Sequence, residues 1–369
     1  MQLGPANLAY YLAERQLLTL ESVVRGDFMV VEQSSRNYNF KVIRENSPGF
    51  FIKQVRQRTA DLTVSFEREA ACYRLALEHQ LFAALQPLMP EFHLFDPKRY
   101  VMVLGLLSGA ESLWQYHRRL GKFPIEIARL QGEKLGQYHA RVKITDDSAP
   151  ELAVFPRALP WILSIHESSP AYLEQLSRGN VQIVGILRQY PEFPRALKEI
   201  RRSWRHNALI HGDIKWENLM VLPDAEGVQD LKVIDWEMAD LGDDCWDIGA
   251  IFQSYWTFWI FSLPLGPEMN LADAAAAAPY DESEMKRAMH AFWHSYVSQR
   301  RLTRKKARRM RERAVRCAAA RMIQTAFESI QRAPQITPHA LCKMQMSMNI
   351  LKDPAAAVRD LVHFQETSR

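Results

Sequence analysis

The segment LIHGDIKWENLMV, residues 209–221, places a group of polar side chains between two short apolar runs. The runs at 208–210 and 219–221 are typical of short buried strands. Polar groups between buried strands are costly unless each finds a hydrogen-bonding partner. This turn is therefore either a fully hydrogen-bonded structural turn or a functional site.

The chain has 369 residues, of which 47% are hydrophobic and 24% charged, as in a soluble globular protein with one large domain or two lobes. Its four cysteines, at positions 72, 245, 317 and 342, lie far apart and form no CxxC pair. This spacing argues against a disulfide framework or a zinc site and favours a reducing compartment, so we expect a cytoplasmic protein. The N-terminus lacks the basic and apolar regions of a signal peptide.

One stretch, IGAIFQSYWTFWIFSLPLG at 248–266, has some features of a membrane span. It contains Gln253, Ser254 and Thr257 and meets Pro264, so its apolar part is short for crossing a bilayer. Its many aromatic residues favour a buried helix or the wall of a pocket. We expect no interaction with a membrane.

Strand patterns come first along the chain and helical patterns follow. Apolar and alternating runs predict strands at 28–32, 38–43, 50–55 and 99–107, and a helix at 66–77. Beyond them, the spacing predicts helices at 125–142, 170–190, 194–204, 283–332 and 354–364, with a short strand at 231–236. This order predicts an α+β protein with a small antiparallel-sheet lobe, residues 1–104, and a large helical lobe, residues 105–369.

Five polar residues occur in the order that phosphoryl transfer would need. Lys53 lies in a predicted strand, and Glu69 follows sixteen residues later on a predicted helix. Asp213 and Asn218 are five residues apart in the opening turn, and Asp235 ends an apolar strand twenty-two residues after Asp213. Phosphoryl transfer needs cations on the phosphates, oxygen ligands for Mg²⁺ and a carboxylate that orients the acceptor hydroxyl. The five residues supply each of these groups.

Three motifs give the chain a resemblance to a known family. They are HGDxxxxN at 211–218, IDWE at 234–237 and DxxDIGA at 244–250. Together they resemble the aminoglycoside phosphotransferase and choline kinase-like family, which has a two-lobed protein-kinase-like fold. The resemblance covers about residues 28–252, and the order of three separate motifs makes it specific. It implies an ATP- and Mg²⁺-dependent kinase that moves the γ-phosphate to a hydroxyl, with a nucleotide-binding lobe at 1–104 and a catalytic, acceptor-binding lobe at 105–369.

The resemblance also implies roles for single residues. Asp213 resembles the catalytic-loop aspartate that orients the acceptor hydroxyl. Asn218 and Asp235 resemble the magnesium ligands, Lys53 the lysine on the nucleotide's phosphates, and Glu69 its ion-pair partner. On the residues alone, Glu67 competes with Glu69 for that role.

Further positions carry supporting roles by the same resemblance. His211 would brace the loop rather than react. Asp247 would accept backbone N–H bonds from that loop. The stretch from Leu104 to Leu106 would lie along the adenine, where its backbone groups would read the base.

The sequence departs from the family in two places. The turn over the phosphates, QSSRN at 33–37, contains no glycine, which limits how closely the backbone can approach a phosphate. We expect the side chains of Ser34, Ser35 and Asn37 to act as donors instead. The second departure is Lys215, which resembles the lysine of DxKxxN in Ser/Thr protein kinases, where it contacts the transferring phosphate.

The acceptor stays open between two classes. Residues 300–316 hold ten basic residues and one acid, although the whole chain has a net charge of only +5. This segment and Lys215 favour a Ser or Thr in a peptide, such as an acidic precursor peptide of ribosomal peptide modification, or an acidic partner protein. The alternative is a small metabolite or antibiotic. A nucleic acid is not expected, because the rest of the chain is net acidic.

A third alternative is a pseudokinase, a scaffold that binds a partner without transferring phosphate. The glycine-free turn supports it. The presence of Lys53, Asp213, Asn218 and Asp235 opposes it.

Overall fold

The computed structural model of the protein describes residues 2–33, 36–144, 149–223, 230–266 and 271–361. The chain forms two compact units. Unit 1 comprises Met1–Glu111, Ser148–Phe155 and Asn218–Ala239, and unit 2 comprises Ser112–Asp147, Pro156–Glu217 and Asp240–Arg369. Ser34 and Ser35, two of the expected phosphate donors, lie outside the described residues.

Unit 1 is built on a five-stranded antiparallel sheet with the order β1-β2-β3-β5-β4. Its strands are β1 (Met29–Glu32), β2 (Asn37–Ile43), β3 (Phe50–Val55), β4 (Phe92–Asp96) and β5 (Val101–Gly105). Aromatic and β-branched residues, which favour a pleated surface, fill most of these segments. The sequence predicted every strand of this sheet except β4, whose short run FHLFD has too little alternation to stand out.

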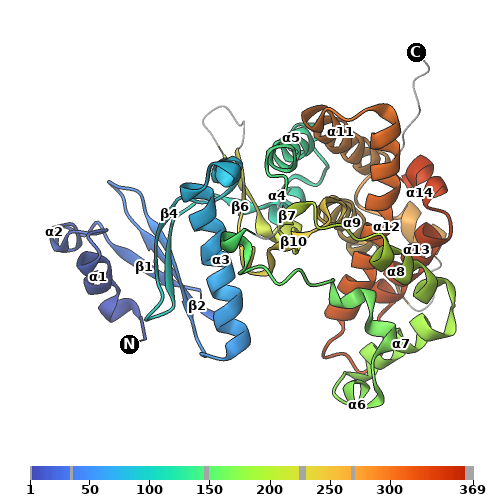
Figure 1. Ribbon diagram of the computed structural model, residues 1–369, viewed down its shortest axis with the longest axis horizontal. Helices are drawn as coiled ribbons and strands as arrows, with labels where there is room; N and C mark the ends of the chain where they lie inside the picture. The colour runs from blue at the N-terminus through green and yellow to red at the C-terminus, as the bar shows by residue number, and fades with distance from the viewer. Residues whose placement is uncertain (1, 34–35, 145–148, 224–229, 267–270, 362–369) are drawn as a thin grey trace. The chain divides into compact units, whose positions relative to one another are not determined.

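The two faces of this sheet have different neighbours. Side chains of one face pack with the N-terminal helices α1 (Pro5–Glu14) and α2 (Leu20–Val24), which lie beside the sheet in Figure 1. The buried cluster on that face contains Leu8, Tyr11, Leu12, Phe40, Val42, Ile52, Val101 and Val103. Because successive residues of a strand point to opposite faces, Asn39, Lys41, Phe51 and Lys53 are directed to the other face.

The remaining elements of unit 1 complete this second face. Helix α3 (Ala60–Glu78) packs on β3 and β4 and is followed by the 3₁₀ helix η1 (Gln80–Leu88). Strands β8 (Leu219–Leu222) and β9 (Asp230–Val233) pair antiparallel, and the 3₁₀ helix η6 (Trp236–Met238) contacts α3. The unit also contains η2 (Pro150–Leu152), and β6 (Glu111–Ser112) begins at its last residue before unit 2.

Unit 2 is largely helical. Its helices are α4 (Leu113–Leu120), α5 (Ile125–Arg141), α6 (Pro170–Leu173), α7 (Arg178–Gln189), α8 (Glu192–Arg202), α9 (Asp244–Ser262), α10 (Leu271–Ala276), α11 (Glu282–Arg300), α12 (Arg304–Ser329), α13 (Pro338–Lys352) and α14 (Pro354–Leu361). Short 3₁₀ helices lie at Trp161–Leu163 and Ile165–Glu167, and a third, η5 (Trp216–Asn218), ends in unit 1. Strands β7 (Ala208–Ile210) and β10 (Asp240–Gly242) pair antiparallel. The α+β class expected from the sequence is confirmed, whereas α4 and α13 were not foreseen.

Helix α9 forms the centre of unit 2. It contains most of the aromatic stretch at 248–266, and nearly all of its side chains are buried. It packs against α11, α12, α13 and β7. The expectation of a buried helix is therefore confirmed, and among the described residues no helix has both the length and the hydropathy needed to cross a membrane.

Helices α5 and α11 approach each other closely because two glycines of α5 face α11. A Cβ atom added to Gly132 would lie 2.1 Å from the carbonyl oxygen of Phe292, and one added to Gly136 would lie 2.8 Å from Cβ of Gln299. The sequence GEKLG, which places a glycine at both ends of one helical turn, thus fixes the distance between the two helices. A side chain at either position would force the helices apart.

We expect Gly132→Ala to lower the free energy of unfolding by about 1–3 kcal/mol, as overpacking of a filled core does. This loss outweighs the ~0.5–1 kcal/mol that alanine gains over glycine within a helix. The matched control is Gly185→Ala in α7, where nothing lies within 4 Å of the new Cβ, so that variant should be more stable than the wild type. Urea unfolding measures both, and equal effects of the two substitutions would contradict the packing described here.

Candidate functional site

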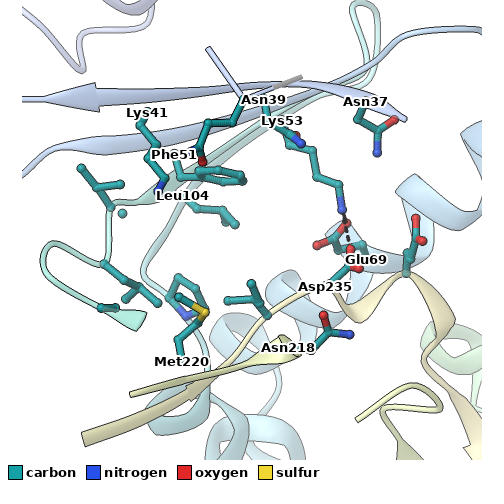
Figure 2. Close-up of a pocket in the computed structure, with 18 of the residues that line it drawn as sticks. Asn37, Asn39, Lys41, Phe51, Lys53, Glu69, Leu104, Asn218, Met220 and Asp235 are labelled. Atoms are coloured by element: carbon teal, nitrogen blue, oxygen red, sulfur yellow. Dashed lines mark hydrogen bonds and ion pairs between the residues drawn. The ribbon is translucent and has the colours of Figure 1, made fainter. Parts of the chain in front are cut away.

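A cavity of about 390 Å³ opens on the second face of the unit 1 sheet. Its volume is that of a small-molecule site. Figure 2 shows side chains from β2 and β3 on one side, with Asn218, Met220 and Asp235 opposite them. All residues that line it belong to unit 1.

Three charged side chains meet at one end of this cavity. Nζ of Lys53 lies 2.6 Å from a carboxylate oxygen of Glu69 and 2.7 Å from one of Asp235 (Figure 2). The ion pair expected between Lys53 and Glu69 is therefore present. Glu67 is only half-buried and forms no ion pair with Lys53 among the described residues, because it points away from β3 on another face of α3.

Burial and pairing act against each other in this cluster. Burial lowers the pKa of Lys53, but the carboxylates of Glu69 and Asp235 outweigh it and raise that pKa above its ordinary value. Burial raises the pKa of Glu69 to about 7, although Lys53 opposes the shift. The lysine is thus held as a cation at the cavity wall.

Asn218 and Asp235 line the same cavity, although they are seventeen residues apart. The N–H of Ile234 donates to the carbonyl of Asn218 at 3.0 Å, which ties the residue before Asp235 to Asn218. Asp235 has φ +67°, a left-handed conformation that aspartate tolerates better than most residues and that is common at functional sites. The carboxylate and the amide supply the oxygen donors that Mg²⁺ prefers.

Strand β2 contributes a row of polar side chains to the cavity. Asn37, Asn39 and Lys41 alternate along the strand, and all three line the cavity. Asn37 is 7% exposed, and its Oδ1 has no hydrogen-bonding partner among the described residues. Of this row only Asn37 lies in the turn QSSRN that the sequence singles out, yet the spacing of two residues along a strand also indicates Asn39 and Lys41. Arg36 and Glu237 also line the cavity and form an ion pair of 2.8 Å.

The stretch from Leu104 to Leu106, which was expected to read the adenine, lines the cavity. Leu104 and Leu106 both line it. The backbone of Leu106 is already engaged, because its N–H donates to the carbonyl of Gly49 at 2.9 Å and its carbonyl accepts from Ser108 at 3.0 Å. Leu107 also lines the cavity, and within the described part of the chain its N–H has no partner. Among the described residues, Leu107 thus leaves its backbone N–H unengaged, whereas Leu106 does not.

The turn at 211–213 is organised in unit 2 by one buried carboxylate. Asp247 accepts backbone hydrogen bonds from His211 at 2.8 Å and Gly212 at 3.1 Å, as the resemblance implied. Burial would raise the pKa of Asp247, but its interactions with His139 and His211 outweigh burial and lower it. Nδ1 of His211 accepts the N–H of Asp213 at 3.2 Å, so this histidine braces the loop.

The carboxylate of Asp213 is held by two cations of unit 2. One oxygen lies 2.7 Å from Nζ of Lys215 and the other 3.3 Å from a guanidinium nitrogen of Arg321. The sequence did not point to Arg321 as a functional residue. It follows the basic segment 300–316, and a basic run of this kind is usually a solvated helix face. The chain passes from unit 2 to unit 1 after Glu217, so Asp213 belongs to unit 2 and Asn218 to unit 1.

The basic segment 300–316 is partly neutralised within unit 2. Ion pairs join Arg300 to Asp244, Arg308 to Glu312, Arg313 to Asp243 and Arg316 to Glu199. Lys305, Lys306 and Arg309 remain exposed near the start of α12. At least four of the ten basic residues of the segment are thus paired with acids, and the cationic surface that it presents is smaller than the number of its basic residues indicates.

Trp216 does not contribute a binding platform. It is fully buried and stacks on His117 with ring centroids 4.1 Å apart, so it packs in the core of unit 2.

Known proteins resemble this chain in sequence and in fold. Residues 28–292 match the family described as the phosphotransferase enzyme family. An ethanolamine kinase from Plasmodium vivax has a similar structure at 12% identity, with a TM-score of 0.59 over 92% of this chain and 86% of that one. A glucosamine kinase in complex with glucosamine, ADP and inorganic phosphate is 15% identical, with a TM-score of 0.53 over 97% of this chain and 88% of that one. No curated protein sequence is significantly similar to the chain.

The structural similarity confirms the expected α+β, protein-kinase-like fold. At these identities it shows the fold and not the substrate.

The buried ion cluster predicts a difference between two glutamates of the same helix. Glu69→Ala should lower the free energy of unfolding by about 3 kcal/mol, the lower end of the cost of breaking a buried pair, because Asp235 still accompanies Lys53. Glu67→Ala should change it by no more than about 0.5 kcal/mol, as is usual for a position outside such a cluster. Thermal and urea unfolding of both variants test this expectation. Similar losses at the two positions would show that the cluster does not stabilise unit 1.

Proposed function

We propose that this chain, which belongs to the phosphotransferase enzyme family, is an ATP- and Mg²⁺-dependent kinase that transfers the γ-phosphate to a hydroxyl of a small molecule. Family membership makes it a phosphotransferase with an alcohol group as acceptor. The observation that carries the proposal is the cluster of Lys53, Glu69 and Asp235 in one cavity with Asn218.

This cluster has the charges that a metal-bound triphosphate needs. Lys53 offers a cation to the phosphates, and Glu69 holds it in place from α3. Asp235 and Asn218 would hold Mg²⁺ through their oxygens, and the ion would neutralise charge on the phosphates. The phosphate end of the proposed nucleotide site thus draws on Lys53 and Glu69 together with Asn218 and Asp235.

The rest of the cavity suits a nucleoside. Phe51, Leu104, Leu106 and Met220 provide apolar walls for a base, and the N–H of Leu107, which also lines the cavity, would donate to it. Asn37 and Asn39 offer amide groups along β2, and we propose them, with Ser34 and Ser35, as donors that replace glycine backbone contacts at the phosphates. Such donors require fixed side chains, so their contribution to affinity is smaller than that of a preformed backbone loop.

Asp213 is the proposed partner of the acceptor. The hydroxyl oxygen forms a bond to the γ-phosphorus, the bond between that phosphorus and the leaving ADP oxygen breaks, and the hydroxyl proton passes to Asp213. Lys215 would leave its ion pair with Asp213 to contact the transferring phosphate.

A small molecule is the better-supported acceptor class. The two similar structures are, by name, kinases of ethanolamine and glucosamine, both small compounds with hydroxyl groups. The peptide alternative depended on Lys215 and on a broad cationic face. That face is reduced by its ion pairs with acids of unit 2. No described contact favours a peptide.

Two substitutions separate the proposed roles. Asp213→Asn should reduce phosphate transfer by about 10²–10⁴-fold, because the carboxylate that accepts the proton is lost, while MgATP binding changes little. Asp235→Asn should instead weaken MgATP binding, because it removes a charged metal ligand. ADP release and calorimetry distinguish the two outcomes. Wild-type turnover of the Asp213→Asn protein would exclude the assigned role.

Acceptor class can be tested with the wild-type chain. We expect ADP release in the presence of Mg²⁺ to rise with one or more compounds from a panel of amino alcohols, sugars and amino sugars, and not with acidic Ser- or Thr-containing peptides. Mass spectrometry should find one added phosphate on the active compound, and the Asp213→Asn protein serves as the control for contaminating kinases. If only the peptides were phosphorylated, the acceptor would be a peptide and the small-molecule proposal would be wrong.

A further inference from the structure

Arg321 lies in an apolar part of α12. Its neighbours in the sequence CAAARMI, residues 317–323, are small or apolar. The side chain is only 4% exposed. A guanidinium keeps its charge at any ordinary pH, so its burial is unfavourable unless the surrounding groups compensate it. The partners of Arg321 therefore show what holds it there.

Those partners belong to the turn that contains Asp213. One terminal nitrogen donates to the carbonyl of Gly212 at 2.9 Å, and the other lies 3.3 Å from Oδ1 of Asp213. The guanidinium carbon lies 5.2 Å from the ring centroid of Trp246, and that distance suits a cation–π contact. The fork of the arginine thus spans two consecutive residues of the turn.

The close packing of α9 and α12 explains how the arginine reaches this turn. A Cβ atom on Gly249 of α9 would lie 2.7 Å from the backbone nitrogen of Ala318 and 2.8 Å from Cβ of Cys317. Only glycine permits this approach, and the alanines at 318–320 keep α12 thin at the same level. Arg321 follows within one turn of the helix and extends past Trp246 to Gly212 and Asp213.

The two cations on Asp213 differ in freedom. The side chain of Lys215 is 44% exposed, whereas that of Arg321 is 4% exposed. An exposed lysine can exchange its partner at little cost, but a buried arginine that loses its partner leaves a charge unpaired. Oδ2, the oxygen bound by Lys215, is therefore the one whose ion partner can change during a reaction.

We propose that Arg321 is a positioning residue for phosphate transfer, which holds Oδ1 of Asp213 so that Oδ2 receives the proton of the acceptor hydroxyl. The inference rests on the proposed function of Asp213. As the bond from the hydroxyl oxygen to the γ-phosphorus forms and the bond to ADP breaks, Lys215 moves from Oδ2 to the phosphate. Arg321 stays on Oδ1 throughout and keeps the carboxylate from rotating.

A purely structural role would need only the contact with Gly212. The backbone of this turn is already held without Arg321, because Asp247 accepts from the N–H groups of His211 and Gly212, and Trp246 donates to the carbonyl of Gly212 at 3.2 Å. The guanidinium nitrogen that contacts Asp213 therefore adds little to the stability of the backbone of this turn. What it adds is a fixed orientation of the carboxylate.

The first test is Arg321→Met, which keeps most of the side-chain volume and removes both polar contacts. The matched control is Arg313→Met on the same helix, whose arginine pairs with the buried Asp243 and donates to the carbonyl of Ser203. Both variants lose an ion pair of α12, so both should unfold at a lower temperature. Magnesium-dependent ADP release is the readout, with water as the acceptor present in every assay and with any compound that the acceptor panel identifies.

Arg321→Met should lower turnover about 10²-fold, the effect of misplacing a catalytic group, at unchanged affinity for MgATP. Arg313→Met should leave turnover unchanged. The Asp213→Asn background then separates positioning from stability. If Arg321 acts through Asp213, adding Arg321→Met to Asp213→Asn should change turnover by no more than about twofold, whereas independent effects would multiply.

Wild-type turnover of Arg321→Met would overturn the proposal, as would an equal loss in the wild-type and Asp213→Asn backgrounds. If the methionine variant does not fold, Arg321→Lys decides, because lysine keeps the charge but cannot span both contacts. The turnover of Arg321→Lys should fall at least about tenfold, which is the effect of losing one hydrogen bond to a charged group. Undiminished turnover of this variant would overturn the proposal. Full activity of Asp213→Asn alone would instead refute the proposed function itself.

Discussion

The buried pairing of Lys53 with Glu69 and Asp235 is the constraint on which the arrangement of unit 1 depends. The three side chains come from β3, from α3 and from the residue two positions after β9. A charge taken out of water is tolerated only with its partners in place, so the pairing restricts where α3 and the β8–β9 hairpin can pack on the sheet. The same three charged side chains also line the cavity, so they both stabilise unit 1 and belong to the proposed nucleotide site.

Unit 2 also contains buried charges that need partners, and a different set of residues supplies them. Asp247 is completely buried at the start of α9, and its two bonds to the backbone of His211 and Gly212 shape the turn before Asp213. Arg321 reaches that turn from α12 because Gly249 and the alanine run allow the two helices to touch. In both units a buried ionic contact joins elements that are distant in the sequence, and in both the contact ends at a residue with a proposed chemical role.

Most of the residues with a proposed chemical role could be predicted from the sequence. Asp213, Asn218 and Asp235 stand in motifs whose spacing is set by a strand or a turn, and Lys53 stands in a predicted strand, so local patterns were sufficient to single them out. Predicting that Lys53 pairs with Glu69 instead of Glu67 would have required knowing which face of α3 is turned toward β3. Arg321 could not be predicted, because it lies 108 residues after Asp213 and the contact depends on how α9 and α12 pack. The backbone bond of Leu106 to Gly49 was hidden for the same reason, since a sequence does not show which strand neighbours engage a given N–H.

The charges near Asp213 also limit how a cationic acceptor could be recognised. With Lys215 and Arg321 both on its carboxylate, Asp213 has no uncompensated negative charge with which to attract a cation. The buried acids at the start of α9 do not supply one either, because Asp243 pairs with Arg313 and Asp244 with Arg300. Attraction between a charged acceptor and a protein depends on such uncompensated charge. On the proposed function, an amino alcohol or amino sugar would therefore be selected by hydrogen bonds and shape at its hydroxyl end, and neutral sugars would be as suitable for testing as acceptors.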